Sequence, residues 1–145
     1  MSWAYFDTSA LIKRYVDEEG RPEVLQLLRR HQCVTSQLLS VELRSALRRR
    51  VTDGSLDARR VPEILKRFAA DREFWAQVEV TSEVVQAAER LVAAYPLRTL
   101  DAIHVASAEL FADRLASSEL TFVSADARQT AVAAAIGMAT EDIVS

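Results

Sequence analysis

Short apolar runs alternate along this chain with longer stretches in which apolar residues recur every three or four positions. This alternation is the strongest constraint on the fold, because it predicts an α/β domain with a parallel sheet. We expect about five short strands, at residues 3–6, 33–35, 77–80 and 120–124 and near Met138. The 145 residues are half apolar and contain no repeat, linker or low-complexity tract, so residues 1–145 are expected to form one domain.

Helical patterns fill the segments between the expected strands. The first begins after Asp7, where Thr8 or Ser9 can serve as the N-cap. Ser36 is expected to cap a longer helix at about 37–51. Further helices are expected at about 24–28, 57–74, 82–95 and 99–115 and after Asp126. The turn at 52–54 predicts that the helices at 37–51 and 57–74 form a hairpin.

Scarce residue types exclude several kinds of site. The only glycines, Gly20, Gly54 and Gly137, lie too far apart for a phosphate-binding loop or a dinucleotide-binding turn. One cysteine and two histidines do not supply the ligand spacing of a zinc site. The formal net charge of -3 means that any nucleic-acid contact must be a local basic patch. Chemistry based on oxygen ligands therefore remains.

The chain is expected to be soluble and cytoplasmic, with no membrane association. Its single cysteine, Cys33, allows no intrachain disulfide, as is usual in a reducing compartment. Asp7 interrupts the first apolar run, which argues against a signal peptide. No apolar stretch approaches the roughly 20 residues that a membrane-spanning helix needs.

Four carboxylates have sequence surroundings that differ from those of an ordinary solvated surface. Asp7 and Asp126 follow apolar strands, which places them at the carboxyl edge of a parallel sheet, where open α/β folds bind ligands. Glu42 flanks an apolar helical stripe and has no cation three or four residues away. Asp101 is expected in the first turn of its helix, the end that favours negative charge.

Each acid alone also fits a structural role, since Asp7, Asp101 and Asp126 can act as helix caps or first-turn acids and Glu42 as a helix-edge residue. Their convergence would need a different explanation. Two carboxylates about 4 Å apart repel by about 4 kcal/mol at an effective dielectric constant of 20. A hard divalent cation such as Mg²⁺ or Mn²⁺ reverses the sign of this interaction and suits phosphate chemistry with an activated water.

Four segments together resemble the PIN-domain family, and more narrowly its VapC-type toxin ribonucleases. They are YFDTSAL at 5–11, SVEL at 40–43, LDAIHVA at 100–106 and TFVSAD at 121–126. The resemblance covers nearly the whole chain, with the segments in the expected order. It implies a three-layer α/β/α fold and an Mg²⁺- or Mn²⁺-dependent endoribonuclease that leaves a 5′-phosphate and a 3′-hydroxyl.

The resemblance also implies roles for particular residues and partners. Asp7 and Asp101 match the surest metal ligands, while Glu42 and Asp126 match acids that act on the metal directly or through water. Ser9 matches a hydroxyl position that orients a carboxylate or a water. The implied partners are an RNA substrate and a small antitoxin protein, in a homodimer or a toxin–antitoxin hetero-oligomer.

Arginines outnumber lysines by sixteen to two and provide candidate phosphate contacts. Arg98 and Arg14 lie close in sequence to the acids, and the clusters 48–50 and 59–60 flank the hairpin turn. Solvated helix faces explain these clusters equally well. Arginine binds phosphate bidentately, so the same residues can hold an RNA backbone or instead pair with an acidic segment of an antitoxin.

Three other functions compete with the nuclease hypothesis. The first is a non-catalytic PIN-like domain that binds RNA or protein. The second is a phosphatase with an aspartyl nucleophile, which favours a second aspartate where this chain has Ser9. The third, a catalytic arrangement of Ser9, His104 and Asp101, lacks the G-x-S-x-G turn, and a single histidine near an apolar helix face is more often structural.

Overall fold

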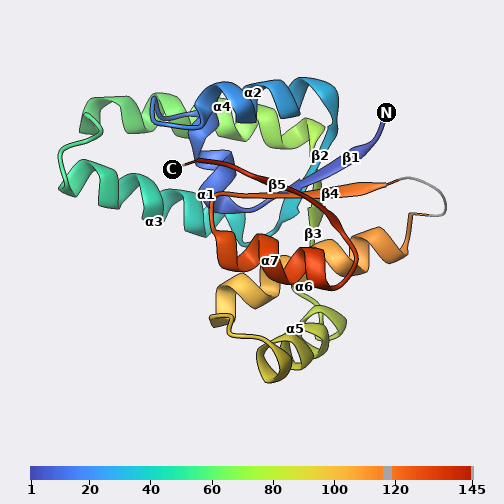
Figure 1. Ribbon diagram of the computed structural model, residues 1–145. Coiled ribbons are helices and arrows are strands. Elements are labelled where there is room, and N and C mark those ends of the chain that lie inside the picture. The colour runs from blue at the N-terminus through green and yellow to red at the C-terminus, as the bar shows by residue number, and fades with distance from the viewer. Residues whose placement is uncertain (116–118, 145) are drawn as a thin grey trace.

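Five parallel strands form the centre of the computed structural model, which describes residues 1–115 and 119–144 (Figure 1). Their order across the sheet is β3-β2-β1-β4-β5, and all four neighbouring pairs are parallel. The expectation of an α/β fold with a parallel sheet of about five strands is confirmed. The strands are β1 (Trp3–Phe6), β2 (Gln32–Ser36), β3 (Ala76–Val78), β4 (Leu120–Ser124) and β5 (Ala139–Asp142).

Helices connect the strands in the expected places. They are α1 (Thr8–Leu11), α2 (Arg21–Arg30), α3 (Leu39–Thr52), α4 (Val61–Asp71), α5 (Ser82–Ala94), α6 (Thr99–Asp113) and α7 (Ala127–Ala135), with short 3₁₀ turns η1 (Ile12–Arg14), η2 (Ala58–Arg60) and η3 (Arg72–Phe74).

Several local expectations need correction. The helix expected at 57–74 is divided into η2, α4 and η3, because the Asp57 side chain caps a separate 3₁₀ turn before Pro62 opens α4. Asp7 itself, rather than Thr8 or Ser9, is the N-cap of α1. Ser36 accepts a hydrogen bond from the Leu38 amide, but Leu38 rather than Ser36 is the N-cap, and α3 begins at Leu39. Met138 precedes the edge strand β5.

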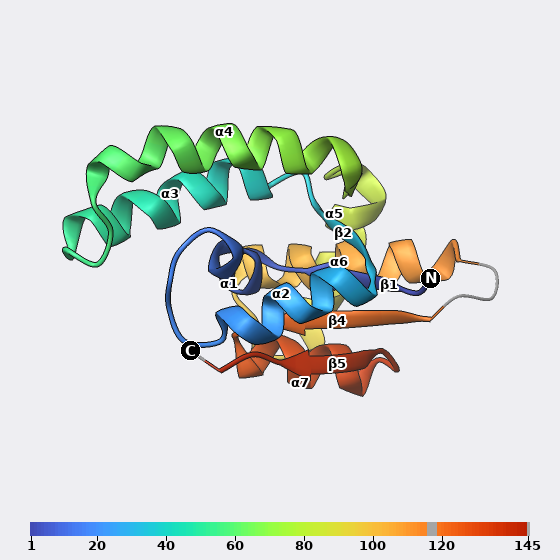
Figure 2. The same ribbon diagram turned by 90° about the horizontal axis from the view of Figure 1, so that it is seen from above.

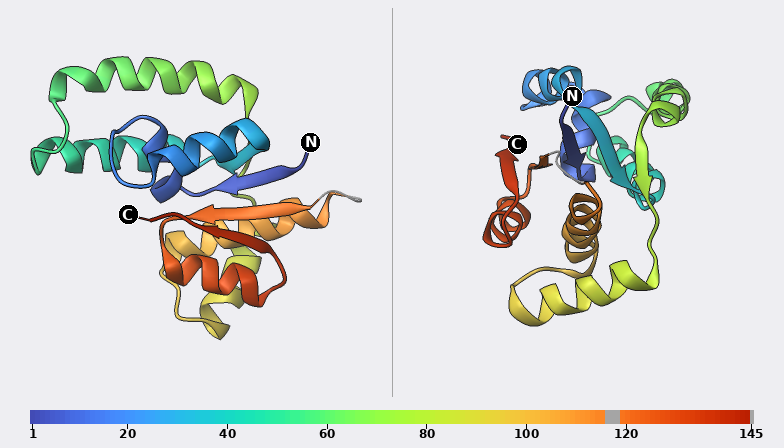
Figure 3. Two further views of the ribbon diagram at one scale, coloured as in Figure 1. Left: turned by 45° about the horizontal axis from the view of Figure 1, so that its top comes forward. Right: turned by 90° about the vertical axis from the view of Figure 1, so that its right-hand side faces the viewer.

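Alternate side chains of the strands pack against two separate helical layers. Ala4 and Phe6 of β1 lie in a core with residues of α1 to α4, whereas Tyr5 lies in a second core with α5, α6 and α7. This division follows from the period of two in a strand, which sends successive side chains to opposite faces. The sheet is therefore the middle of three layers, as the resemblance implied (Figure 3).

The helices α3 and α4 form the expected hairpin, which extends beyond the sheet (Figure 2). Asp71 at the end of α4 connects this hairpin to the N-terminal part of the chain. Its carboxylate accepts hydrogen bonds of 2.7 and 3.0 Å from Arg14 and one of 2.6 Å from the hydroxyl of Tyr15. The hairpin is thus fixed relative to η1, and α3 runs past the carboxyl end of the sheet.

The strand order produces a crevice between β1 and β4. The chain leaves β1 through α1 and α2 on one face of the sheet and enters β4 from α6 on the other. Diverging connections of this kind leave an opening at the carboxyl ends of the two strands, where α/β folds bind ligands. None of the helices in the described residues has the length and apolar character needed to cross a membrane.

Gly20 is required where the start of α2 approaches the C-terminal segment. Its φ is +92°, and a Cβ placed there would clash with the carbonyl oxygen of Val144 and lie 2.6 Å from Cγ2 of Ile143. We expect Gly20→Ala to lower the free energy of unfolding by about 2–4 kcal/mol, from left-handed backbone strain and overpacking together. Urea denaturation measures this loss.

Gly54→Ala provides the matched control, because Gly54 also has a positive φ, +85°, but no atom of the described residues lies within 4 Å of the added Cβ. It should lose only the strain energy of about 1–2 kcal/mol. Equal losses in the two variants would contradict a special role for the close approach at Gly20.

Candidate active site

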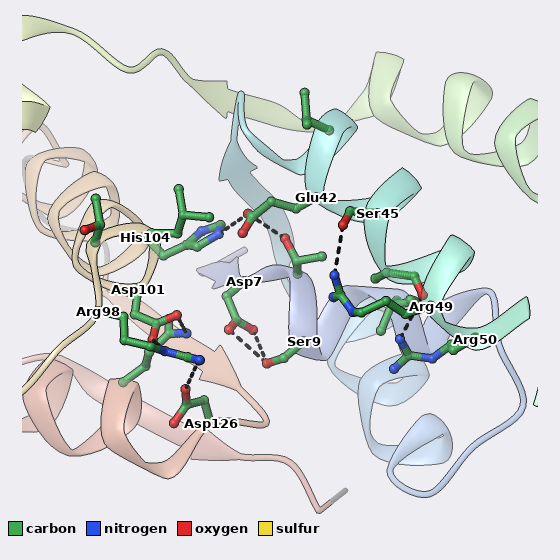
Figure 4. A pocket seen from close by; sticks show the side chains of 17 residues that line it. Asp7, Ser9, Glu42, Ser45, Arg49, Arg50, Arg98, Asp101, His104 and Asp126 are labelled. Carbon is green, nitrogen blue, oxygen red and sulfur yellow. Dashed lines mark hydrogen bonds and ion pairs between the residues drawn. The ribbon is translucent and has the colours of Figure 1, made fainter. Parts of the chain in front are cut away.

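All four candidate carboxylates line one cavity of about 670 Å³ at the carboxyl edge of the sheet (Figure 4). Asp7 follows β1, Glu42 lies on α3, Asp101 lies on α6 and Asp126 follows β4. Ser9 and Arg98 line the same cavity. The structure therefore brings together residues that are up to 119 positions apart in the sequence, as the hypothesis of converging acids required.

Asp7 is fixed in position by its neighbours. The side chain is buried at 2% exposure and caps α1 through a 3.1 Å hydrogen bond from the Ala10 amide. The hydroxyls of Ser9 and Ser124 each donate to it at 2.8 Å. Burial raises the pKa of Asp7 above its usual value, although the nearby charge of His104 and these hydrogen bonds oppose the rise. The structural role as a cap and the position in the cavity coexist in this residue.

Glu42 is oriented by a chain of hydrogen bonds that begins in the core. The Nε2 of His104 lies 2.5 Å from Oε1 of Glu42, and its Nδ1 lies 2.8 Å from the hydroxyl of Tyr5. The hydroxyl of Thr8 also donates to Oε1 of Glu42, at 2.9 Å. His104 is thus a hydrogen-bonded structural residue, and within the described residues no hydrogen bond joins it to Ser9, so no serine–histidine–aspartate array forms.

The charges of His104 and Glu42 stabilise one another. Burial alone would lower the pKa of His104, but the hydrogen bond and charge of Glu42 raise it overall. Burial alone would raise the pKa of Glu42, but the hydrogen bond and charge of His104, with smaller contributions from Thr8 and Arg49, lower it overall. We therefore treat the pair as imidazolium and carboxylate.

Arg98 supplies positive charge between the other two acids. Its Nε donates to Oδ2 of Asp101 at 3.0 Å, and a terminal nitrogen lies 3.8 Å from Oδ2 of Asp126. The amide of Gln129 donates to the remaining oxygen of Asp101 at 3.0 Å. Asp126 also caps α7, because it accepts from the amide of Arg128 at 2.9 Å. With 72% of the Arg98 side chain exposed, this cation approaches the acids from the solvent side of the cavity.

The donor atoms suit a hard divalent cation, but they are not gathered around one point. In the described part of the chain, no three carboxylate, imidazole or thiol groups lie close enough to hold a metal ion as they stand. Four carboxylates around one cavity nevertheless provide the oxygen ligands that Mg²⁺ and Mn²⁺ prefer. Gln129 lines the same cavity, and its buried Oε1 has no hydrogen-bond partner among the described atoms.

One predicted site residue lies elsewhere, and three contributors were missed. Arg14 does not line the cavity, because its guanidinium forms the ion pair with Asp71 that holds the α3–α4 hairpin. The sequence interpretation overlooked Ser124, Gln129 and the role of His104 as the partner of Glu42. Two of them had a sequence signal: Ser124 precedes Asp126 by two residues, and Gln129 follows it by three, on the same helical face.

Comparisons with known proteins agree on the fold. A family model described as "PIN domain" matches residues 4–136. A toxin–antitoxin complex from Klebsiella pneumoniae contains a similar chain, with 19% identity, a TM-score of 0.64 and coverage of 88% of this chain and 90% of that one. VapBC2 from Rickettsia felis, solved with a DNA fragment from its promoter, gives 9% identity, a TM-score of 0.64 and coverage of 97% and 98%. No curated protein sequence matches significantly.

The His104–Glu42 pair should make stability depend on pH. Because the folded pKa of His104 lies above its unfolded value near 6.5, its stabilisation is complete below that pH and lost as the pH rises through the folded pKa. We expect His104→Gln to lose about 2–3 kcal/mol near pH 6, where the charged hydrogen bond is intact, and less toward about pH 9. Urea titrations across this range measure the difference.

His31→Gln is the control. Because burial and the charge of Arg30 lower the pKa of His31, the contribution of His31 to stability changes with pH in the opposite direction. A loss in His104→Gln that stays constant from about pH 6 to about pH 9 would contradict a raised pKa, and a loss that grows toward about pH 9 would show that His104 is neutral in the folded protein.

Proposed function

This chain belongs to the PIN domain family, and from that premise we propose that it is a divalent-metal-dependent endoribonuclease, the toxin of a toxin–antitoxin pair. The observation that carries the proposal is the shared cavity of Asp7, Glu42, Asp101 and Asp126. Helix capping does not account for this set of acids, because only two of the four, Asp7 and Asp126, cap a helix through their side chains.

Mg²⁺ or Mn²⁺ is the proposed cofactor. Asp7 and Asp101 would hold it directly, and Glu42 and Asp126 directly or through water. The bound cation would polarise a phosphoryl oxygen of RNA and lower the pKa of a water, so that a phosphodiester is hydrolysed to a 5′-phosphate and a 3′-hydroxyl.

The chain's own residues prepare the cavity for this reaction. Ser9 donates to Asp7 and accepts from the Ala125 amide at 3.0 Å, so it joins the ends of β1 and β4 and fixes the direction of the Asp7 carboxylate. His104 and Thr8 leave Oε2 of Glu42 free of hydrogen bonds within the described residues. Holding Asp7 and Glu42 in these orientations reduces the rearrangement that the cavity needs when substrate arrives.

Arg98 is proposed to serve in two successive arrangements. Before substrate binds, it compensates the charge of Asp101 and Asp126. With a divalent cation held by these acids, the exposed guanidinium of Arg98 would be available to a phosphate of the RNA, which arginine binds through paired hydrogen bonds.

The proposed protein partner is a small antitoxin, in a hetero-oligomer or with a homodimer of this chain. One of the two similar structures described above is a toxin–antitoxin complex and the other is VapBC2, which supports this part of the proposal. A cytoplasmic location fits such a pair.

A non-catalytic RNA- or protein-binding domain is the second candidate. The observation that favours it is that protein groups already partner each acid in the cavity, with a hydroxyl on Asp7 and positively charged side chains beside the other three. The two candidates differ in whether the acids bind a divalent cation and in whether RNA is cut.

Single substitutions of the acids test the catalytic proposal. Asp7→Asn and Asp101→Asn should each lower the rate of Mg²⁺-dependent RNA cleavage at least ~100-fold, because each removes a proposed metal ligand while keeping the side-chain shape. Gel analysis of RNA fragments gives the rate, and circular dichroism checks folding. Asp53→Asn, an exposed turn residue that accepts from the Ser55 amide, is the matched control and should cleave normally. Cleavage at the full rate in both variants, with chelator present, would exclude the proposal.

Binding of Mn²⁺ by calorimetry tests the role assigned to Arg98. We expect Arg98→Gln to bind Mn²⁺ about 3- to 5-fold more tightly in the absence of RNA, because the exposed ion pair between Arg98 and Asp101 no longer competes with the metal. Arg114→Gln, which removes an exposed pair with Glu83 away from the cavity, should leave the affinity unchanged. Weaker Mn²⁺ binding by Arg98→Gln would contradict competition between Arg98 and the metal.

A further inference from the structure

A row of three polar side chains leads along α3 from the acidic centre to the end of the helix. Glu42, Ser45 and Arg49 are spaced by three and four residues, so they share one face of the helix, and all three line the cavity (Figure 4). At 1.5 Å of rise per residue, Arg49 lies about 10 Å along the helix axis from Glu42. The cavity thus has an acidic end and a basic end on a single rigid helix.

Arg49 is the basic group at this end whose charge is not already neutralised. Its one hydrogen bond within the described residues is from Nη1 to the hydroxyl of Ser45, at 2.9 Å, and it forms no ion pair there. By contrast, Glu18 accepts from Arg50 at 2.9 and 3.0 Å. The positive charge of Arg49 also helps to lower the pKa of Glu42, so it acts on the acidic centre itself.

A neighbouring cavity of about 390 Å³ does not offer the same opportunity. It shares Ser9 and Arg50 with the first cavity, but there Arg50 and Lys13 stand against two acids, Glu18 and Glu19. Its charges are balanced, so an anion gains little by entering. The Ser45–Arg49 end of the main cavity is therefore the better place for a phosphate.

Position on the helix separates Arg49 from the other arginines of α3. Arg44, Arg48 and Arg49 are all exposed, but Arg44 and Arg48 line neither cavity. Arg49 and Arg50 both lie in the last turn of α3, where a cation interacts favourably with the helix dipole, but that explanation does not account for the unpaired charge of Arg49 in the cavity. The difference lies in the cavity that Arg49 shares with the acids.

We propose that Arg49, held by Ser45, binds a backbone phosphate that flanks the scissile phosphate, so that a single RNA strand runs along α3 from Glu42 toward the hairpin turn. This assignment rests on the proposed function. A strand placed against four carboxylates is repelled on both sides of any bound cation, and a guanidinium one step along the strand offsets this repulsion. Arginine suits the task because its fork of donors matches two phosphate oxygens.

The experiment measures RNA affinity separately from cleavage. A fluorescein-labelled single-stranded RNA of mixed sequence is titrated with protein in Mg²⁺, in an Asp7→Asn background that leaves the RNA intact, and anisotropy reports binding. Arg49→Gln should weaken binding about 5- to 10-fold and reduce the slope of log affinity against log salt by about 0.7, the value for one lost phosphate contact on a single strand. Arg48→Gln, with the same change of charge on the adjacent residue, should change affinity less than about twofold.

Cleavage kinetics of the otherwise unchanged protein provide a second readout. Because the contact is present in both substrate and transition state, Arg49→Gln should raise KM several-fold with kcat nearly unchanged. Arg49→Lys, which keeps the charge but not the fork, should fall between Arg49→Gln and the parent protein.

Equal RNA affinities for Arg49→Gln and Arg48→Gln would overturn the assignment while leaving the proposed nuclease intact. The assignment would also fail if Arg49→Gln kept normal RNA affinity but lost binding to an octaglutamate peptide, since the site would then take an acidic protein segment. If the parent protein cuts no RNA, the proposed function fails. A selective loss of RNA affinity in Arg49→Gln would then still support the phosphate site. An unchanged RNA affinity in Arg49→Gln would exclude the phosphate site as well.

Discussion

Repulsion among like charges is the constraint on which the rest of this structure depends. Asp7, Glu42, Asp101 and Asp126 come from four separate parts of the chain and line one cavity. Any two carboxylates at about 4 Å would repel by about 4 kcal/mol at an effective dielectric constant of 20. The fold avoids this cost because the four carboxylates do not converge on a single point and because each has its own partners. These partners are hydroxyls for Asp7, His104 for Glu42, and Arg98 for Asp101 and Asp126.

These partners differ in how firmly they are held, and that difference has functional meaning. The supports of Asp7 and Glu42 lie in the core, since Ser124 and His104 are buried at 0% and 2% exposure. Arg98 reaches the acids from the surface, and most of its side chain is exposed. The cavity therefore combines a fixed half at β1 and α3 with a half between α6 and α7 whose cation can be exchanged. We propose that a divalent cation enters at this exchangeable half.

Much of this arrangement was predictable from sequence, because it follows from local patterns. Asp7 and Asp126 come directly or shortly after apolar strands, and parallel strands bring such residues to one edge. The helical spacing around Glu42 and the position of Asp101 at the start of α6 could also be predicted from the sequence. What the patterns did not contain was pairing across the fold. Arg14 seemed close to the acids because Asp7 is near in sequence, yet its partner, Asp71, is 57 residues away on α4. Likewise, the contact of His104 with Glu42 spans 62 residues.

The central claim is that these acids form a divalent cation site, and a crystal of the protein soaked in Mn²⁺ tests it most directly through the anomalous scattering of the metal. We expect an anomalous peak within coordinating distance of the carboxylates of Asp7 and Asp101, with the guanidinium of Arg98 moved away from Asp101. A cavity without such a peak at saturating Mn²⁺, with Arg98 still paired to Asp101, would contradict the claim.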